Sequence, residues 1–214
     1  MVQRLRVLIQ IIFLLFFVSL LRMGRMQLWM MVILATVLLA AGLGRFYCGW
    51  ICPINTLMGL VEGLARKMGW KGRPVPGWAR SRLLRWLILA VLVVVMGLTM
   101  GRGIKLPFIL LIIPLAIGFT LCYNSVLWHR YLCPFGILFS LTSQWAPVGL
   151  KVDRDKCSSC GLCTRVCPAE AVSLRGKGET ARIENRYCLE CFLCQEACPR
   201  GAISFGVGRQ RVSG

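Results

Sequence analysis

Eight cysteines near the C-terminus, set out in one spacing that occurs twice, constrain this chain more than any other feature. Both runs read Cys-x2-Cys-x2-Cys-x3-Cys-Pro; they are Cys157, Cys160, Cys163, Cys167 and Pro168, and Cys188, Cys191, Cys194, Cys198 and Pro199. The runs superpose at a shift of 31 residues, and apolar positions beyond the cysteines match as well, since Val172 falls on Ile203. The segment is therefore an internal duplication.

The spacing is the pattern of bacterial ferredoxins that hold two [4Fe-4S] clusters. A cubane cluster needs four soft thiolate ligands that converge from several directions, and each close triplet supplies three of them. In this motif the fourth cysteine of a run ligates the other cluster. The motif thus predicts one cluster on Cys157, Cys160, Cys163 and Cys198, and a second on Cys188, Cys191, Cys194 and Cys167.

Zinc ligation and disulfide bonding fit the cysteine spacing less well. Zinc sites use paired Cys-x2-Cys knuckles rather than triplets followed by Cys-Pro. A disulfide framework belongs to small secreted domains, and the long apolar remainder of this chain is not one. A reducing compartment, which keeps thiols free for iron, suits the eight cysteines better.

Acidic residues and cysteines divide the chain into two parts. Residues 1–149 contain the long apolar runs and one acid, Glu62, whereas residues 150–214 contain eight of the twelve cysteines and seven of the eight acids. We therefore expect a membrane all-α domain over residues 1–149, a small α+β ferredoxin domain over 150–206 and a disordered basic tail over 207–214. Pro147 and Gly149 are expected to form the hinge between the domains.

The membrane domain is expected to contain four transmembrane helices, over residues 7–21, 26–43, 84–100 and 108–123. The first run is short and follows a basic start, so a signal peptide is the alternative; the absence of a small-residue cleavage site from the sequence after it favours a retained helix. Residues 54–68 and 137–145 are expected to form interfacial helices. Tryptophans near the segment ends are expected to be interface anchors: Trp29, Trp50, Trp78, Trp86, Trp128 and Trp145.

Basic residues indicate how the membrane domain is oriented. The formal net charge is +18, and most of the excess lies in loops between the apolar runs, which argues against a nucleic-acid partner. Eleven Lys and Arg residues fall on one side of the predicted spans and four on the other. The positive-inside rule then places both termini and the ferredoxin domain in the cytoplasm, for a multi-pass protein of the cell inner membrane.

The membrane domain also repeats itself, because two apolar runs in each half lead into a cysteine-proline corner. The corners are residues 48–53 and 129–134, and their alignment places Cys48 on His129 and Cys52 on Cys133. Residues four apart share a helix face, so each corner would present two ligand-type side chains together. The residue before a proline disfavours helix, so each corner is expected to break the helix there.

With these corners and the two cysteine runs, the chain resembles the NapH-type membrane ferredoxins, the quinol-oxidising components of periplasmic nitrate reductase systems. The resemblance implies four spans, two [4Fe-4S] clusters, and single-electron relay between the ferredoxin and either the quinone pool or a respiratory partner protein. The chain would be a non-catalytic electron-transfer subunit. Similar modules occur in NosR-type regulators and in RdxA/CcoG assembly proteins. That likeness implies the alternative, a maturation factor that reduces a metal or a thiol for a respiratory enzyme.

One position departs from the family pattern, because His129 stands where the second corner would have a cysteine. Two interpretations remain open for the corner residues. They could bind quinone or a further metal centre, or they could be packed structural side chains. The residues are Cys48, Cys52, His129 and Cys133. Arg45 and Arg130 beside them could meet a quinone head group or lipid phosphate, or only orient the helices, and Cys122 is expected to be a buried structural thiol.

Overall fold

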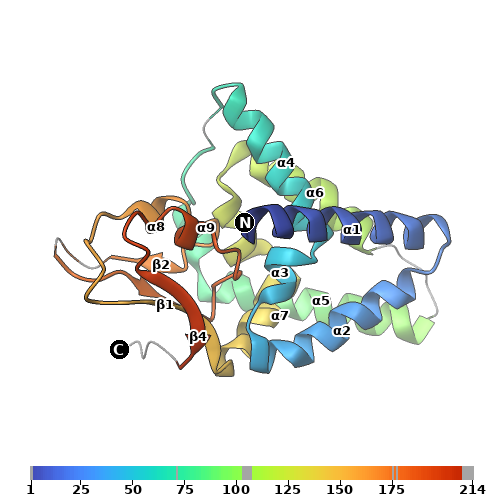
Figure 1. Ribbon diagram of the computed structural model, residues 1–214. Helices are drawn as coiled ribbons and strands as arrows, with labels where there is room; N and C mark the ends of the chain where they lie inside the picture. Colours follow the sequence, from blue (N-terminus) through green and yellow to red (C-terminus); the bar gives the residue numbers. More distant parts are fainter. Residues whose placement is uncertain (1, 71, 103–107, 175, 177, 209–214) are drawn as a thin grey trace. The chain divides into compact units, whose positions relative to one another are not determined.

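The computed structural model describes residues 2–70, 72–102, 108–174, 176 and 178–208 (Figure 1). The chain forms two compact units. The first joins Met1–Pro53 with Phe139–Gly214, and the second is Ile54–Leu138. The ferredoxin cysteines therefore belong to the same compact unit as the N-terminal helices.

Two apolar helices open the first unit, α1 (Val2–Arg22) and α2 (Met26–Leu43). They pack through the fully buried Trp29, which meets Phe17 edge-on with 5.1 Å between ring centroids. Away from this contact the helices carry exposed apolar side chains, with Leu15 65% and Leu38 71% exposed. Of the helices that the structure describes, these two are long and apolar enough to cross a membrane. Their exposed apolar surface indicates a membrane protein.

The first corner follows α2. A short helix, α3 (Phe46–Trp50), ends there, and α4 (Pro53–Lys67) begins directly after it. The amide of Cys52 donates to the carbonyl of Tyr47, five residues earlier, at 3.0 Å. This turn is wider than the four-residue turn of a regular α-helix. The helix breaks at the residue before Pro53, as the sequence predicts.

The second unit contains most of α4, the short η1 (Gly77–Arg80), α5 (Arg82–Arg102), α6 (Phe108–Cys122), the π-helical turn η2 (Leu127–Leu132) and the start of α7 (Pro134–Thr142). Its core lies where η1 meets η2, around the fully buried Ala79 and Leu127. The second corner has the same wide turn as the first, because the amide of Cys133 donates to the carbonyl of Trp128, five residues earlier, at 2.8 Å.

The ferredoxin part of the first unit has two similar halves, reached from α7 through η3 (Ser143–Trp145). Each half contains a strand, a cysteine loop, a one-turn helix and a second strand. In chain order these are β1 (Val148–Val152), α8 (Leu162–Arg165), β2 (Val172–Ser173), β3 (Arg182–Ile183), α9 (Leu193–Glu196) and β4 (Ile203–Val207). Each strand pairs antiparallel with a strand of the other half, β1 with β4 and β2 with β3. Both halves thereby contribute to one apolar core.

Several boundaries differ from the sequence-based expectations. The expected hinge at Gly149 is wrong, because this residue lies inside β1 opposite Gly206, where strand pairing keeps the backbone extended. The expected start of the disordered tail at residue 207 is also wrong, because Val207 still pairs with Val148 in the sheet. Residues 209–214 of that tail lie outside the described residues, as do residues 103–107 of the turn expected between the third and fourth apolar runs.

Three of the tryptophans expected at the membrane interface lie inside the protein. Trp29, Trp50 and Trp128 are 0%, 6% and 4% exposed. Aromatic neighbours cover them, Phe17 beside Trp29 and Phe119 beside Trp128. A position near the end of an apolar run therefore does not by itself make a tryptophan an anchor.

Candidate functional site

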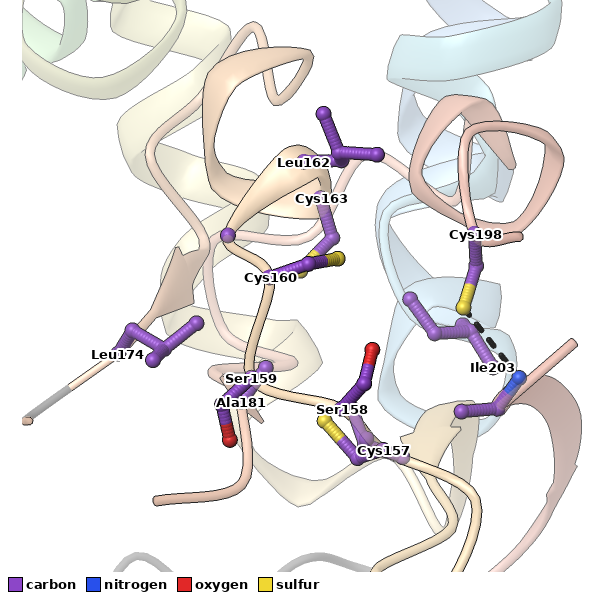
Figure 2. A pocket seen from close by; sticks show the side chains of 13 residues that line it. Cys157, Ser158, Ser159, Cys160, Leu162, Cys163, Leu174, Ala181, Cys198 and Ile203 are labelled. Atoms are coloured by element: carbon purple, nitrogen blue, oxygen red, sulfur yellow. Dashed lines mark hydrogen bonds between the residues drawn. The ribbon is translucent and has the colours of Figure 1, made fainter. Parts of the chain in front are cut away.

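A hollow that is partly open to solvent lies at the first cysteine triplet (Figure 2). Four cysteines line it. Cys157, Cys160 and Cys163 come from the loop before α8 and from α8, and Cys198 comes from the segment after α9. The other walls are mostly apolar or small, as at Val152. Four soft sulfur donors around one apolar hollow fit the ligand set of a cubane cluster.

The second triplet lies near Cys167 of the first run. Burial raises the pKa of Cys188 well above its usual value, and the charges of Cys191, Cys194 and Cys167 raise it further. Burial also raises the pKa of Cys194 to about 12, with smaller contributions from Cys191 and Cys167. Thiols in such a group become thiolates readily only when a cation offsets their charge, which iron would do. This second donor set also fits a cluster.

Backbone amides hold the fourth cysteine of each run in the same way. The amide of Ala171 donates to Sγ of Cys167 at 3.2 Å, and the amide of Ala202 donates to Sγ of Cys198 at 3.3 Å, the dashed contact in Figure 2. Hydrogen bonds to ligating sulfur are among the features that set the reduction potential of a cluster.

The two cysteine loops follow one backbone path, with left-handed residues at equivalent places. φ is 56° at Ser159 and 52° at Glu190, and it is 73° at Gly161 and 59° at Phe192. A phenylalanine in this region costs ~1–2 kcal/mol. The ring of Phe192 meets Trp50 of α3 edge-on, with 5.9 Å between centroids. This packing offsets the backbone strain.

The first corner lies against the second cysteine loop. Cys48 is buried and Cys52 is half-buried. The Arg45 side chain is 1% exposed; it donates to the carbonyl of Tyr187 at 3.5 Å and lies 3.9 Å from Sγ of Cys48. Lipid phosphate, one of the partners that the sequence suggests for Arg45, does not fit this position, because protein encloses the guanidinium. The wide turn also means that the two cysteines do not lie on one regular α-helix, as the four-residue spacing had suggested.

The second corner belongs to the other compact unit. His129 is buried in η2, and Sγ of the half-buried Cys133 accepts a hydrogen bond from the amide of Gly136 at 3.3 Å. Cys122, expected to be buried, is exposed at the end of α6, because the helix turns that residue away from the unit's core.

The structure gives no separate support for a single-ion metal site. Within the part of the chain that it describes, no three His, Cys, Asp or Glu side chains are placed to hold one metal ion. This finding concerns single ions. In a cubane each thiolate binds a different iron atom, so the four sulfurs stand farther apart than the ligands of one zinc ion.

Two models of iron–sulfur protein families match this chain. A family model described as "4Fe-4S binding domain" matches residues 25–71 and 106–152, and one described as "4Fe-4S dicluster domain" matches residues 149–199. The chain is 33% identical over 160 residues to "Ferredoxin-type protein NapH" of Haemophilus influenzae, which covers 65% of this chain and 53% of that protein. The chain is a NapH-type membrane ferredoxin.

Other relatives are similar over comparable lengths. "Uncharacterized protein MJ0749" of Methanocaldococcus jannaschii is 32% identical over 140 residues, covering 63% of this chain and 55% of that protein. "Putative electron transport protein YccM" of Escherichia coli is 25% identical over 163 residues, covering 65% and 46%. This ferredoxin therefore spans about half the length of the curated relatives it matches.

Sequence reasoning missed the contact between the first corner and the second cysteine loop. Glu190 in that loop is 3% exposed, and burial raises the pKa of its carboxyl to about 8. One signal could have revealed the contact. The second loop carries Leu189 and Phe192 where the first carries Ser158 and Gly161, so the second loop is the more apolar at these two positions.

Proposed function

We propose that this ferredoxin is a membrane-bound electron carrier that relays single electrons between two [4Fe-4S] clusters and the membrane. The observation that carries the proposal is the hollow lined by Cys157, Cys160, Cys163 and Cys198, because sulfur donors from both halves of the duplication gather there. An iron–sulfur electron-transfer role is supported by relatives named NapH and MauN, both ferredoxin-type proteins, and by YccM.

The proposed ligands are the four cysteines of that hollow for one cluster, and Cys188, Cys191, Cys194 and Cys167 for the other. Each bound cluster accepts and releases one electron at a time. The chain's own residues hold the iron through thiolates, exclude water by burial and donate amide hydrogen bonds to sulfur. The protein thereby sets the potential and position of each cluster, and electron transfer between the clusters requires no catalytic acid or base.

The membrane part is proposed to cross the bilayer four times, through α1, α2, α5 and α6. α5 has 21 residues, and α6 has 15 with Pro114 inside. The match of one family model in both halves supports a two-fold repeat of this part. The distribution of Lys and Arg supports a cytoplasmic location for both termini and for the ferredoxin part.

The membrane-side partner is proposed to be the quinone pool or a respiratory redox protein. It would exchange electrons near the two corners, at Cys48 and Cys52 and at His129 and Cys133. The contact of the first corner with a cysteine loop supports this location, because Arg45 donates to the carbonyl of Tyr187 directly before Cys188.

Iron and sulfide analysis tests the cluster proposal. Protein purified anaerobically is expected to contain about eight irons and eight sulfides per chain, as two cubanes require. Cys160→Ser is expected to lower this to about four, while Cys122→Ser, which changes an exposed cysteine outside the proposed ligand sets, leaves about eight. A wild-type chain without iron, or with zinc in place of iron, would overturn the proposal.

A regulatory or maturation role is the second candidate. The observation that favours it is the similarity to "Regulatory protein NosR" of Pseudomonas aeruginosa, 28% identical over 166 residues, which covers 68% of this chain and 23% of that protein. Deleting the gene separates the two functions. Under the relay, the respiratory partner enzyme keeps its metal but receives no electrons; under the maturation role, it is present but deficient in metal.

A further inference from the structure

We infer that one cysteine loop is covered by the N-terminal helices while the other is open to solvent, so that the two proposed clusters are not interchangeable. Residues 188–192, here the membrane-side loop, dock on α1 and α3. Residues 157–163, here the outward loop, face solvent. The inference rests on the proposed function, and it assigns electron exchange with the membrane to the cysteine group that includes Cys188, Cys191 and Cys194.

The duplication supplies an internal comparison of the two loops. Ser158 in the outward loop is exposed, whereas its equivalent in the membrane-side loop, Leu189, is 2% exposed. Gly161 is replaced at the equivalent position by Phe192, which packs on Trp50. At these two positions of one backbone path, the first copy carries small residues and the second carries large apolar ones, as expected if only the second copy is covered by protein.

Hydrogen bonds hold the membrane-side loop from two helices. Gln3 of α1 donates through Nε2 to the carbonyl of Cys191 at 2.8 Å, and Arg6 donates through Nη1 to the same oxygen at 3.4 Å. Trp50 of α3 donates through Nε1 to the carbonyl of Glu190 at 2.9 Å. The loop's own carbonyls are therefore satisfied by the N-terminal segment, which fixes the loop's position as well as its burial.

At Gly49 of α3 the backbones lie so close that only glycine fits, because a Cβ atom there would overlap the carbonyl oxygen of Leu189. A Cβ atom on Gly44, which caps α2, would meet the carboxyl end of the Glu190 side chain. Gly49 is itself held in place, since its carbonyl accepts from Nε of Arg6 at 2.9 Å and from Nε2 of Gln10 at 3.0 Å. Glycine at such a position permits a close approach of two backbones.

The outward loop has a different environment. Cys160 is exposed, and the hollow that it lines is partly open to solvent. Ser159 donates through Oγ to the carbonyl of Glu179 at 2.6 Å, a contact inside the ferredoxin part. Leu162 and Val166 beside this loop are 39% and 38% exposed. A water-soluble donor therefore reaches this cysteine group more directly than the other.

Cys188, Cys191, Cys194 and Cys167 would hold the cluster that exchanges electrons with the membrane, and Cys157, Cys160, Cys163 and Cys198 would hold the cluster that exchanges them with a soluble one-electron carrier. No bond of the protein itself would form or break. If the membrane-side donor is a quinol, its oxidation to quinone would give two electrons, passed on one at a time, and release two protons to solvent. In the opposite direction a quinone would take up two electrons and two protons.

Cysteine footprinting tests the two faces without measuring activity. The iron-loaded protein is treated anaerobically with an iron chelator and iodoacetamide, and mass spectrometry follows the alkylation of each cysteine over time. We expect Cys157, Cys160 and Cys198, which are exposed or half-buried, to be modified at least tenfold faster than the buried Cys188, Cys191 and Cys194. Equal rates, or the reverse order, would overturn the inference.

Two variants connect the difference in rate to the docking contact. Gly49→Ala is expected to accelerate alkylation of the Cys188 group severalfold, while Gly42→Ala, whose added methyl meets no atom within 4 Å, keeps the wild-type rates. If Gly49→Ala does not fold, Gln3→Ala removes one bond to Cys191 and is expected to accelerate the same group to a smaller extent. Unchanged rates in the folded variants would count against docking through α1 and α3.

The iron content shows whether a negative result contradicts the proposed function or only the inference about the two loops. A chain without iron contradicts the proposed function, yet its cysteines still report which loop is covered. A chain with about eight irons and equal alkylation rates keeps the proposed function and overturns the inference.

Discussion

The indole Nε1 of Trp50 donates a hydrogen bond of 2.9 Å to the backbone carbonyl of Glu190, 140 residues later in the chain. Trp50 belongs to a membrane corner, and Glu190 lies between two cysteines of the second run. Tyr47, directly before the corner, stacks on Phe139 of α7, with 5.2 Å between ring centroids. The first contact joins the N-terminal helices to the ferredoxin part, and the second joins them to the end of α7 in the same compact unit.

Replacing Trp50 by phenylalanine tests the strength of this connection. Trp50→Phe keeps an aromatic ring but removes the donor to the buried Glu190, so we expect the free energy of unfolding to fall by about 1–2 kcal/mol. Thermal unfolding in detergent, followed by circular dichroism, measures the change. Trp145→Phe is the matched control, because Trp145 is 64% exposed. Equal midpoints for the two variants would show that the bond contributes little.

If the fourth cysteine of each run ligates the other cluster, substitutions in different runs are expected to damage the same cluster. Cys198→Ser and Cys163→Ser are expected to weaken the same cluster and to leave the same residual electron paramagnetic resonance spectrum after reduction. Cys167→Ser and Cys194→Ser are expected to share the other residual spectrum. If Cys198→Ser instead matched Cys194→Ser, each run would ligate a single cluster.

Left-handed backbone at Gly161 predicts a conformational penalty for a side chain. Gly161 has φ 73°, and the nearest atom to an added Cβ is Oγ1 of Thr164 at 3.9 Å, so Gly161→Ala costs strain without a clash. We expect a loss of ~1 kcal/mol in unfolding free energy, measured by thermal unfolding of the iron-loaded protein. Gly206→Ala in β4, which also meets no neighbouring atom, is expected to leave stability unchanged within ~0.5 kcal/mol.

Orientation in the membrane is tested with reporters at the C-terminus. If the ferredoxin part is cytoplasmic, a green fluorescent protein fusion after Gly214 fluoresces and an alkaline phosphatase fusion is inactive, because the phosphatase needs an oxidising compartment for its disulfides. Active phosphatase with dark fluorescent protein would reverse the proposed topology.

Local sequence signals predicted the regular elements well. The apolar run over residues 26–43 coincides with α2, and both corners break at the residue before proline. These features depend on apolar composition and on proline sterics, which act over a few residues. Strand pairing was harder to predict from the sequence, because β1 and β4 pair across more than 50 residues. The position of Gly149 inside β1 depends on that distant partner strand.

By itself the sequence determined the two cysteine runs, their duplication and the apolar segments, because metal-ligand spacing and hydrophobicity are written in consecutive residues. Only the tertiary structure decided which cysteine loop is covered. The loops share one backbone path, and what separates them is contact with Gln3, Gly49 and Trp50 from the far end of the chain. Burial and hydrogen bonding are properties of neighbours in space, so two copies of one motif can have different environments.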